Sequence, residues 1–273
     1  MGWERAAAGP HAPRQAPTID RPHAYPQPQP HRPTEQKLHT NPGNFRAFKI
    51  LVAALYNGVD IQVVDVDLAK KGKDVAAKSP AGKVPVLETP QGTLFESNAI
   101  ARYVARLRRD TELYGATFFE SGLVDAWVDF AANELELPAT LWVYPVFGYL
   151  PANAGVTEKA KADLAAALAK VDAHLADKTY LVGEKVTLAD IACASALVYP
   201  FKIVMDPAYR AQFPNVLRWF LTIVNQPQFK DVIGEVWTCA RCGRGAGPIN
   251  HRLINPTPQH HPVHHRWRWP RRS

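Results

Sequence analysis

The sequence contains 273 residues, of which 47% are hydrophobic and 21% are charged. A chain of this length can bury a substantial core, as one large domain or two smaller ones. Three cysteines are too few for a disulfide framework, which fits a reducing compartment. The longest apolar stretch, Ile191 to Phe201, is too short to span a bilayer, and the N-terminus lacks an apolar signal segment. We therefore expect a cytoplasmic protein without a membrane span.

The composition changes sharply at both ends of the chain. Residues 1–37 hold eight of the 24 prolines, whereas residues 240–273 hold seven arginines and five histidines but neither Asp nor Glu. Neither segment contains the periodic apolar residues that would offset the entropy cost of ordering it. We predict a disordered leader over residues 1–36 and a disordered basic tail over residues 239–273.

The ends also carry the net positive charge. Before Leu38 there are five basic and three acidic residues, from Leu38 to Cys239 there are 20 and 22, and after Cys239 there are seven and none. A basic chain invites a nucleic-acid interpretation, but here the positive charge lies in a tail without a recognition motif. We expect no direct nucleic-acid binding by the folded part.

The tail combines Cys239 and Cys242 in one CxxC motif with five histidines that follow it. This combination superficially suggests zinc, but one CxxC motif and histidine spacings unlike those of a zinc finger do not make a metal site. We therefore predict no bound metal. The abrupt change in composition leads to the hypothesis that the tail, and by extension the leader, is translated from an intron or a shifted frame. Native peptides covering residues 247–266 would refute it.

Strands and helices alternate at the start of the folded part. A short strand over residues 35–40 is followed by the turn Asn41-Pro42-Gly43 and by a helix that starts at Asn44 and ends at Gly58. Alternating apolar residues over 59–66 predict a second strand. These elements form a βαβ unit.

A second group of elements follows a helical turn or loop around residues 70–78. Residues 84–88 and 93–95 are predicted as a hairpin with a four-residue turn, and Ser97 is expected to cap a helix that runs through Arg108. The order of this group is ββα. The first half of the folded part is therefore predicted to be α/β.

Only helices are predicted after Leu113. Apolar residues recur at helical spacing from Leu123 to Phe130 and again from Leu164 to Leu175. The folded part thus divides into an α/β domain over residues 37–110 and an all-α domain over residues 111–238.

One local motif in the all-α domain is a capping box. Thr187 and Asp190 can each accept a hydrogen bond from the other's backbone amide, and the Asp190 carboxylate suits the positive end of a helix. We expect this motif to begin a buried helix and to have a structural role.

Four motifs between Leu38 and Trp237 carry more than local information. They are Asn44 to Gly58, Ser79-Pro80-Ala81-Gly82-Lys83-Val84-Pro85, Phe95-Glu96-Ser97-Asn98-Ala99-Ile100, and Leu181-Val182-Gly183-Glu184 leading into Thr187-Leu188-Ala189-Asp190. Together they resemble cytosolic glutathione transferases. The resemblance implies a thioredoxin-like α/β half followed by an all-helical half, the cytosolic glutathione transferase fold.

Further motifs are more specific within that superfamily. They are Asn44-Phe45-Arg46-Ala47-Phe48-Lys49, Pro80-Ala81-Gly82-Lys83-Val84-Pro85, Phe213-Pro214-Asn215, Gln226-Pro227-Gln228-Phe229 and Gly234-Glu235-Val236. They resemble the glutathione-transferase-like domain of the gamma subunit of elongation factor 1. That resemblance implies a non-catalytic scaffold that anchors the nucleotide-exchange subunits of the complex in protein synthesis. These subunits are the implied partners, with a homo-oligomer as a further option.

The scaffold interpretation needs an apolar surface on which a partner can dock. Trp127, Trp142, Tyr144 and Phe147 are candidate anchors, although aromatic residues at such spacing are also typical of a core. The gamma subunit continues through a charged linker into a second domain, whereas the resemblance ends here near Trp237.

The resemblance also implies a glutathione site. Val84 precedes Pro85 at the family's cis-proline step, where the Val84 backbone would meet the ligand; the alternative is a purely structural turn. Glu96 could pair with the γ-glutamyl ammonium and Ser97 with its carboxylate, unless Ser97 is only a helix cap. Lys83 offers a further contact or is solvated. Glutathione is the implied ligand or substrate, and no cofactor is implied.

The catalytic position is the weak point of an enzyme interpretation. Active transferases place Tyr, Ser or Cys after the first strand, where the side chain stabilises the thiolate or forms a mixed disulfide. This sequence has Asn44 there and no cysteine nearby. An Asn amide can donate one hydrogen bond, but it also suits the cap of the first helix. Three interpretations stay open: a scaffold, a transferase that conjugates glutathione to small electrophiles, and a truncated product without function.

Overall fold

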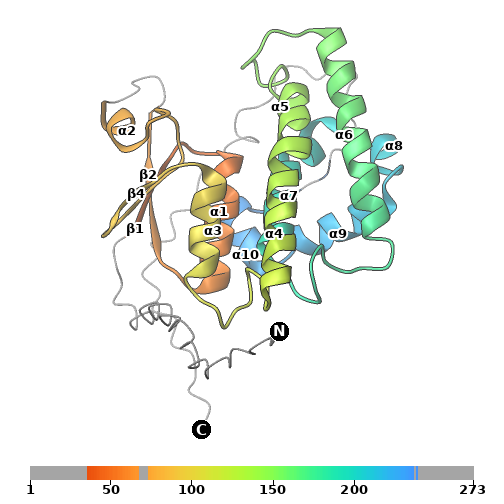
Figure 1. Ribbon diagram of the computed structural model, residues 1–273. Coiled ribbons are helices and arrows are strands. Elements are labelled where there is room, and N and C mark those ends of the chain that lie inside the picture. Colours follow the sequence, from red (N-terminus) through yellow and green to blue (C-terminus); the bar gives the residue numbers. More distant parts are fainter. Residues whose placement is uncertain (1–35, 68–72, 237, 239–273) are drawn as a thin grey trace, which may run out of the picture. The chain divides into compact units, whose positions relative to one another are not determined.

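The computed structural model describes residues 36–67, 73–236 and 238 (Figure 1). The predictions for the leader, the tail and its CxxC motif lie outside these residues. The first half has the predicted order βαβ followed by ββα. Its elements are β1 (Gln36–Thr40), α1 (Phe45–Asn57), β2 (Ile61–Asp65), α2 (Lys73–Lys78), β3 (Val86–Thr89), β4 (Gly92–Leu94) and α3 (Ser97–Arg106).

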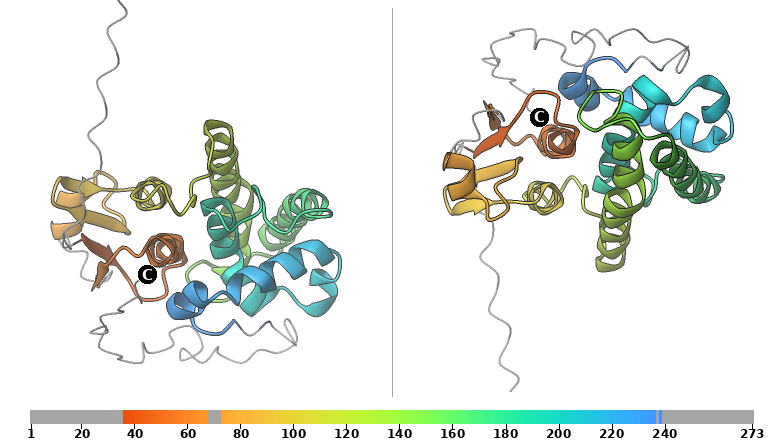
Figure 2. Two further views of the ribbon diagram at one scale, coloured as in Figure 1. Left: turned by 90° about the horizontal axis from the view of Figure 1, so that it is seen from below. Right: turned by 90° about the horizontal axis from the view of Figure 1, so that it is seen from above.

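The four strands form a mixed sheet in the order β2-β1-β3-β4. β1 pairs parallel with β2 and antiparallel with β3, so that Leu38 lies opposite Val63 on one side and Leu87 on the other. Leu38 and Leu87 are fully buried. Helices α1 and α3 pack side by side on the face of the sheet that is turned toward the second half (Figures 1 and 2).

Helix α1 confirms the prediction made from its sequence. Asn44 is its N-cap, and Gly58 ends it in the left-handed conformation with a φ of 59°, which favours glycine. Ile50, Ala53 and Ala54 lie on its buried face. The cap at each end and the apolar spacing between them therefore account for the position and length of this helix.

Two boundaries near the hairpin differ from the prediction. Thr89 pairs with Gly92, so the turn between β3 and β4 contains two residues instead of four. The expectation that Ser97 caps α3 was wrong, because Ser97 is the first helical residue and Glu96 occupies the N-cap position without a side-chain hydrogen bond. α3 ends at Arg106, slightly earlier than predicted.

The second half contains only helices, as predicted, and lies beside α1 and α3 (Figure 2). In the part of the chain that the structure describes, no helix is both long and apolar enough to cross a membrane. The helical segments are α4 (Phe118–Phe130), η1 (Ala131–Glu136), α5 (Leu137–Val143), α6 (Ala154–His174), α7 (Leu188–Tyr199), η2 (Pro200–Val204), α8 (Pro207–Arg210), α9 (Pro214–Val224) and α10 (Pro227–Ile233), where η1 and η2 are π-helical.

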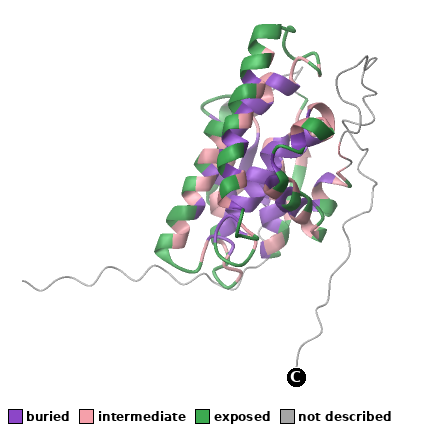
Figure 3. Cartoon of the chain, turned by 90° about the vertical axis from the view of Figure 1, so that its right-hand side faces the viewer, coloured by how far each residue is buried: buried purple, intermediate pink, exposed green. Residues whose placement is uncertain are grey.

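Helix α7 is the centre of the second half. Every residue from Leu188 to Val198 is buried, and the helix packs against α1, α4 and α9. Figure 3 shows the buried residues gathered between the helices and the exposed ones on their outer sides. Cys193 is fully buried within α7. Because α7 contacts α1, the two halves share one apolar core.

The predicted capping box begins α7. The Asp190 carboxylate accepts hydrogen bonds from the Thr187 amide (3.0 Å) and the Thr187 hydroxyl (3.2 Å), and also from the Leu181 amide and the Trp219 indole N–H (both 2.9 Å). Burial raises the pKa of Asp190, and these four donors oppose that effect. Asp190 thus joins the start of α7, the preceding loop and α9, which confirms the structural role expected from the sequence.

Replacement of Asp190 should therefore destabilise the fold strongly. We expect Asp190→Ala to lower the free energy of unfolding by about 3 kcal/mol, because four buried donors lose their acceptor. Urea unfolding followed by circular dichroism measures this loss. Asp163→Ala, which removes an exposed partner of Lys159 on α6, is the control and should change the free energy of unfolding by less than about 0.5 kcal/mol. Equal effects of the two substitutions would contradict the assignment.

Candidate functional site

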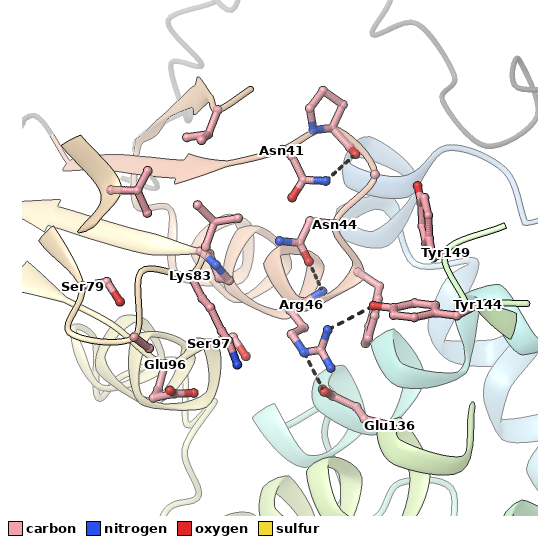
Figure 4. A pocket seen from close by; sticks show the side chains of 18 of the residues that line it. Asn41, Asn44, Arg46, Ser79, Lys83, Glu96, Ser97, Glu136, Tyr144 and Tyr149 are labelled. Carbon is pink, nitrogen blue, oxygen red and sulfur yellow. Dashed lines mark hydrogen bonds and ion pairs between the residues drawn. The ribbon is translucent and has the colours of Figure 1, made fainter. Parts of the chain in front are cut away.

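A cleft of about 1070 Å³ lies between the α/β half and the helical half. One wall comes from the loops after β1 and before β3 and from the start of α3, and the other comes from η1, the segment after α5, and α7. The structure brings together in this cleft every ligand residue that the sequence implied (Figure 4). These residues are Lys83, Val84, Glu96 and Ser97, and Asn44 and Pro85 line the same cleft.

The α/β wall offers several groups that have no partner of their own. The peptide bond between Val84 and Pro85 is cis. Lys83 is exposed, and Ser97 is partly buried at the first position of α3, where backbone amides face the cleft. No hydrogen bond joins either side chain to another described residue, so both are available to a ligand.

Glu96 has the least relaxed backbone of this wall. Its φ is 66° and its ψ is 115°, a region that is unfavourable for a residue with a side chain. The side chain is exposed at the edge of the cleft. Such strain is typical of functional sites, because only the surrounding structure holds the residue there.

The sequence resemblance aligns Asn44 with the thiolate-stabilising residue of active transferases. In the structure its side chain makes hydrogen bonds within the chain. Its side-chain oxygen accepts from the Arg46 amide at 3.1 Å, and its side-chain nitrogen donates to the Thr40 hydroxyl at 3.1 Å. The first bond is the N-cap of α1. Both ends of the amide are therefore engaged within the chain, which leaves one N–H of the amide for a ligand.

Arg46, Asn98 and Glu136 form the floor of the cleft, and Lys49 is buried directly behind them. The Lys49 ammonium donates to the Glu136 carboxylate at 2.7 Å and to the Asn98 side-chain oxygen at 2.5 Å, and the Arg46 guanidinium lies 3.3 Å from Glu136. The side chains of Lys49 and Glu136 are only 1% and 8% exposed. Burial lowers the pKa of Lys49, and the adjacent Glu136 carboxylate opposes this change. The floor thus joins α1 and the start of α3 to η1.

Aromatic side chains form the wall on the helical side. The ring of Phe147 packs edge-on against Tyr149 and Tyr199, and Tyr144 packs edge-on against Tyr149. The Tyr199 hydroxyl donates to the Gly43 carbonyl at 2.6 Å, so this wall also holds the loop that precedes α1. The Arg46 guanidinium lies 3.5 Å from the Tyr144 hydroxyl.

The four aromatic residues proposed as docking anchors are not on the open surface. Trp142 is buried and packs on Tyr209, and Trp127 is partly buried beside Phe130. Tyr144 and Phe147 line the cleft. The core interpretation therefore holds for the two tryptophans.

Sequence reasoning missed the floor of the cleft. Lys49 lies on the same helical face as Phe45, Val52 and Ala53, all of which are buried. A lysine on the apolar face of a helix is the signal that could have identified a buried charge. Nothing in the spacing pointed to Glu136 as its partner.

Comparisons with known proteins agree with this geometry. Residues 35–106 match the family described as "Glutathione S-transferase, N-terminal domain", and residues 138–227 match "Glutathione S-transferase, C-terminal domain". Elongation factor 1-gamma 1 of Oryza sativa subsp. japonica is 44% identical over 202 residues, which are 73% of this chain and 48% of that protein. Elongation factor 1-gamma of Equus caballus is 43% identical over 211 residues, 75% of this chain and 47% of that protein.

A solved structure points the same way. The glutathione-transferase-like domain of elongation factor 1-gamma from Saccharomyces cerevisiae aligns with a TM-score of 0.66 and 26% identity, over 76% of this chain and 96% of that domain. The chain belongs to the glutathione S-transferase family, and its folded part is similar to the glutathione-transferase-like domain of elongation factor 1-gamma. Poplar glutathione transferase F1 shares the fold, with a TM-score of 0.68 and 24% identity over 73% of this chain and 96% of that one. The chain spans about half the length of the elongation factor 1-gamma relatives it matches.

The buried pair of Lys49 and Glu136 can be tested by a double-mutant cycle. Glu136→Gln should cost about 3 kcal/mol of unfolding free energy, because it leaves the Lys49 ammonium buried without its anion. Lys49→Met in the same chain should recover most of that loss, since the unpaired charge is then gone. Urea unfolding of the wild type, both single variants and the double variant measures the coupling.

The exposed pair of Lys159 and Asp163 on α6 provides the matched control. The cycle of Lys159→Met and Asp163→Asn should give a coupling below about 0.5 kcal/mol. Purely additive losses at Lys49 and Glu136 would show that the two side chains do not depend on each other.

Proposed function

We propose that this chain is the non-catalytic gamma subunit of the elongation factor 1 complex, where its transferase-like fold anchors the nucleotide-exchange subunits during protein synthesis. The observation that carries the proposal is Asn44, whose amide caps α1 and binds Thr40 in an otherwise complete transferase cleft. The identity to elongation factor 1-gamma relatives, which extends over most of the described residues, supports it.

The residue at position 44 matters because of the chemistry of thiol activation. A transferase has to stabilise the glutathione thiolate, and a hydroxyl group next to the sulfur does this by donating a hydrogen bond to it. The Asn44 side chain is a neutral amide whose direction is set by the cap of α1 and by Thr40. The chain therefore keeps the fold and the cleft of a transferase but lacks the group that accelerates the reaction.

Rigidity between the two halves suits an anchoring role. The buried charges of Lys49 and Glu136 bridge α1 and η1, and α7 packs against both α1 and α4. A partner that binds one half is then held in a defined orientation to the other. Association loses less free energy when the surface is already ordered.

Affinity purification of the endogenous protein from its own cells, followed by peptide mass spectrometry, tests the proposed role. We expect the nucleotide-exchange subunits of elongation factor 1 to be recovered with it. The same sample should show little conjugation of glutathione to 1-chloro-2,4-dinitrobenzene, because Asn44 offers an amide where active transferases offer a hydroxyl or thiol group. Efficient conjugation without exchange subunits would replace the scaffold by a transferase.

A second candidate function is glutathione binding, and a specific observation favours it. The cis bond before Pro85, the strained backbone of Glu96 and the unpartnered Ser97 lie on one wall of the cleft. Glu96 is placed to pair with the γ-glutamyl ammonium, and Ser97 with the carboxylate next to it. A cleft that binds glutathione without efficient turnover is compatible with the scaffold role.

Calorimetric titration with glutathione measures this second function. Ser97→Ala and Glu96→Ala should each weaken binding by about tenfold, the loss expected from one charge-assisted hydrogen bond. Glu158→Ala, which removes an exposed carboxylate on α6, is the control and should leave the affinity unchanged. Wild-type protein that does not bind glutathione would eliminate this candidate and leave the scaffold proposal intact.

A further inference from the structure

Helix α1 begins with an unusual distribution of charge. Its 13 residues include Arg46 and Lys49 in the N-terminal half but no Asp or Glu. The N-terminal end of a helix carries a partial positive charge, so acidic residues or bound anions are favoured there and cations are not. A sequence that breaks such a local rule usually does so at a functional site. Arg46, the second residue of the helix, is thus placed where an anion, and not a cation, would stabilise the helix.

The ion pair with Glu136 does not account for Arg46. Lys49 already donates to the Glu136 carboxylate at 2.7 Å, whereas the Nε atom of Arg46 lies 3.3 Å from the other carboxylate oxygen. Two cations thus share one anion, and this group keeps one net positive charge. The other charged residues that line the cleft, Lys83 and Glu96, are one of each sign. Since the side chain of Arg46 is 38% exposed and lines the cleft, the surplus positive charge faces the cleft.

Three contacts hold the guanidinium group of Arg46 in one orientation. Its Nε atom faces Glu136, its Nη1 atom donates to the Tyr144 hydroxyl at 3.5 Å, and its central carbon lies 4.6 Å from the centroid of the Phe45 ring. Figure 4 shows the group between the wall that carries Ser97 and the wall that carries Tyr144. The Nη2 atom makes no hydrogen bond to a described residue, and so its two N–H groups can donate to a ligand.

The Tyr144 hydroxyl adds a second donor beside this guanidinium group. It accepts a hydrogen bond from Arg46, and its own hydrogen is donated to no residue in the described part of the chain. The hydroxyl can therefore donate to the same anion that Arg46 binds. Arg46 comes from α1 and Tyr144 from the residue after α5, so the two donors reach one place from the two halves of the folded part.

The expected position of glutathione indicates which part of the ligand meets Arg46. In the second candidate function, Glu96 and Ser97 bind the γ-glutamyl group, and the resemblance aligns Asn44 with the residue beside the sulfur. The Arg46 amide donates to the Asn44 side-chain oxygen at 3.1 Å, so Arg46 belongs to the same turn. The Arg46 side chain then borders the sulfur and the group attached to it.

We infer that Arg46 and Tyr144 make the cleft selective for glutathione derivatives that carry an oxyanion on or next to the sulfur, such as a sulfonate or a carboxylate. A guanidinium group matches the spacing of two anionic oxygen atoms, and hydrogen bonds between charged groups are stronger than neutral ones. A neutral S-alkyl group would leave the surplus charge of Arg46 without a partner. The inference rests on glutathione binding, the second candidate function, and does not require turnover.

Calorimetric titration of the full chain with two probes tests this selectivity. Glutathione sulfonate carries the oxyanion, and S-methylglutathione is its neutral counterpart. We expect the wild type to bind the sulfonate about tenfold more tightly. Arg46→Met should reduce this ratio to about one and change the affinity for S-methylglutathione by less than about threefold. Equal binding of the two probes by the wild type, or a preference that survives Arg46→Met, would overturn the inference.

Three further variants separate this selectivity from folding and from a general attraction of anions. Tyr144→Phe removes the hydroxyl donor and keeps the ring, and should lower the ratio about threefold. Arg46→Lys keeps the charge without the planar group and should show an intermediate ratio, which also serves as the test if Arg46→Met does not fold. Lys83→Met removes the other cation among the described residues of the cleft and should leave the ratio unchanged. Loss of the preference in Lys83→Met alone would assign it to Lys83 and overturn the inference.

Failure of the selectivity differs from failure of the proposed function. A wild type that binds both probes equally would retain glutathione binding and overturn only the role of Arg46. A wild type that binds neither probe would overturn the inference together with the glutathione candidate. Recovery of the nucleotide-exchange subunits from cells would still support the scaffold in either case.

Discussion

The arrangement of the cleft depends on one buried charge, the ammonium group of Lys49. A lysine with a side chain that is only 1% exposed is costly to bury unless an anion lies beside it. Glu136 supplies that anion from the other half of the folded part, and Asn98 accepts a second hydrogen bond from the ammonium. The N-terminal half of α1, the start of α3 and η1 therefore have to meet at one place. Asn44, Ser97 and Arg46 take their positions in the cleft from that meeting.

This dependence gives the cleft a structural cause that does not involve the residue at position 44. Glu136 ends η1, a π-helical segment between α4 and α5, and such segments occur mainly where a side chain has a special position to occupy. If the cleft changed so that Glu136 left Lys49, the ammonium would be buried without its anion. We therefore expect this contact to contribute to folding whether or not a ligand is bound.

The sequence predicted features that depend on neighbouring residues, and it missed features that depend on residues far apart in the chain. Asn44, Gly58 and the pair Thr187–Asp190 act within a few residues, and each was placed correctly. Ser97 was misplaced as a cap because the backbone of Glu96 adopts a positive φ that no local propensity favours. The contact of Lys49 with Glu136 joins residues 87 positions apart, and helical periodicity contains no information about such a partner. The ligand residues were located through family motifs, because their side chains make few contacts of their own.

The helical run from Phe118 to Val143 contributes both to the apolar core and to the buried charges beneath the cleft. Its inner side carries Val124 and Val128 into the core and ends in Glu136 beneath the cleft. Asp125 and Asp129 on the same run bind Arg102 of α3, whereas Asn133 and Glu134 are exposed. The same run therefore supplies both apolar side chains to the core and the carboxylate beneath the cleft, so that the two cannot move independently.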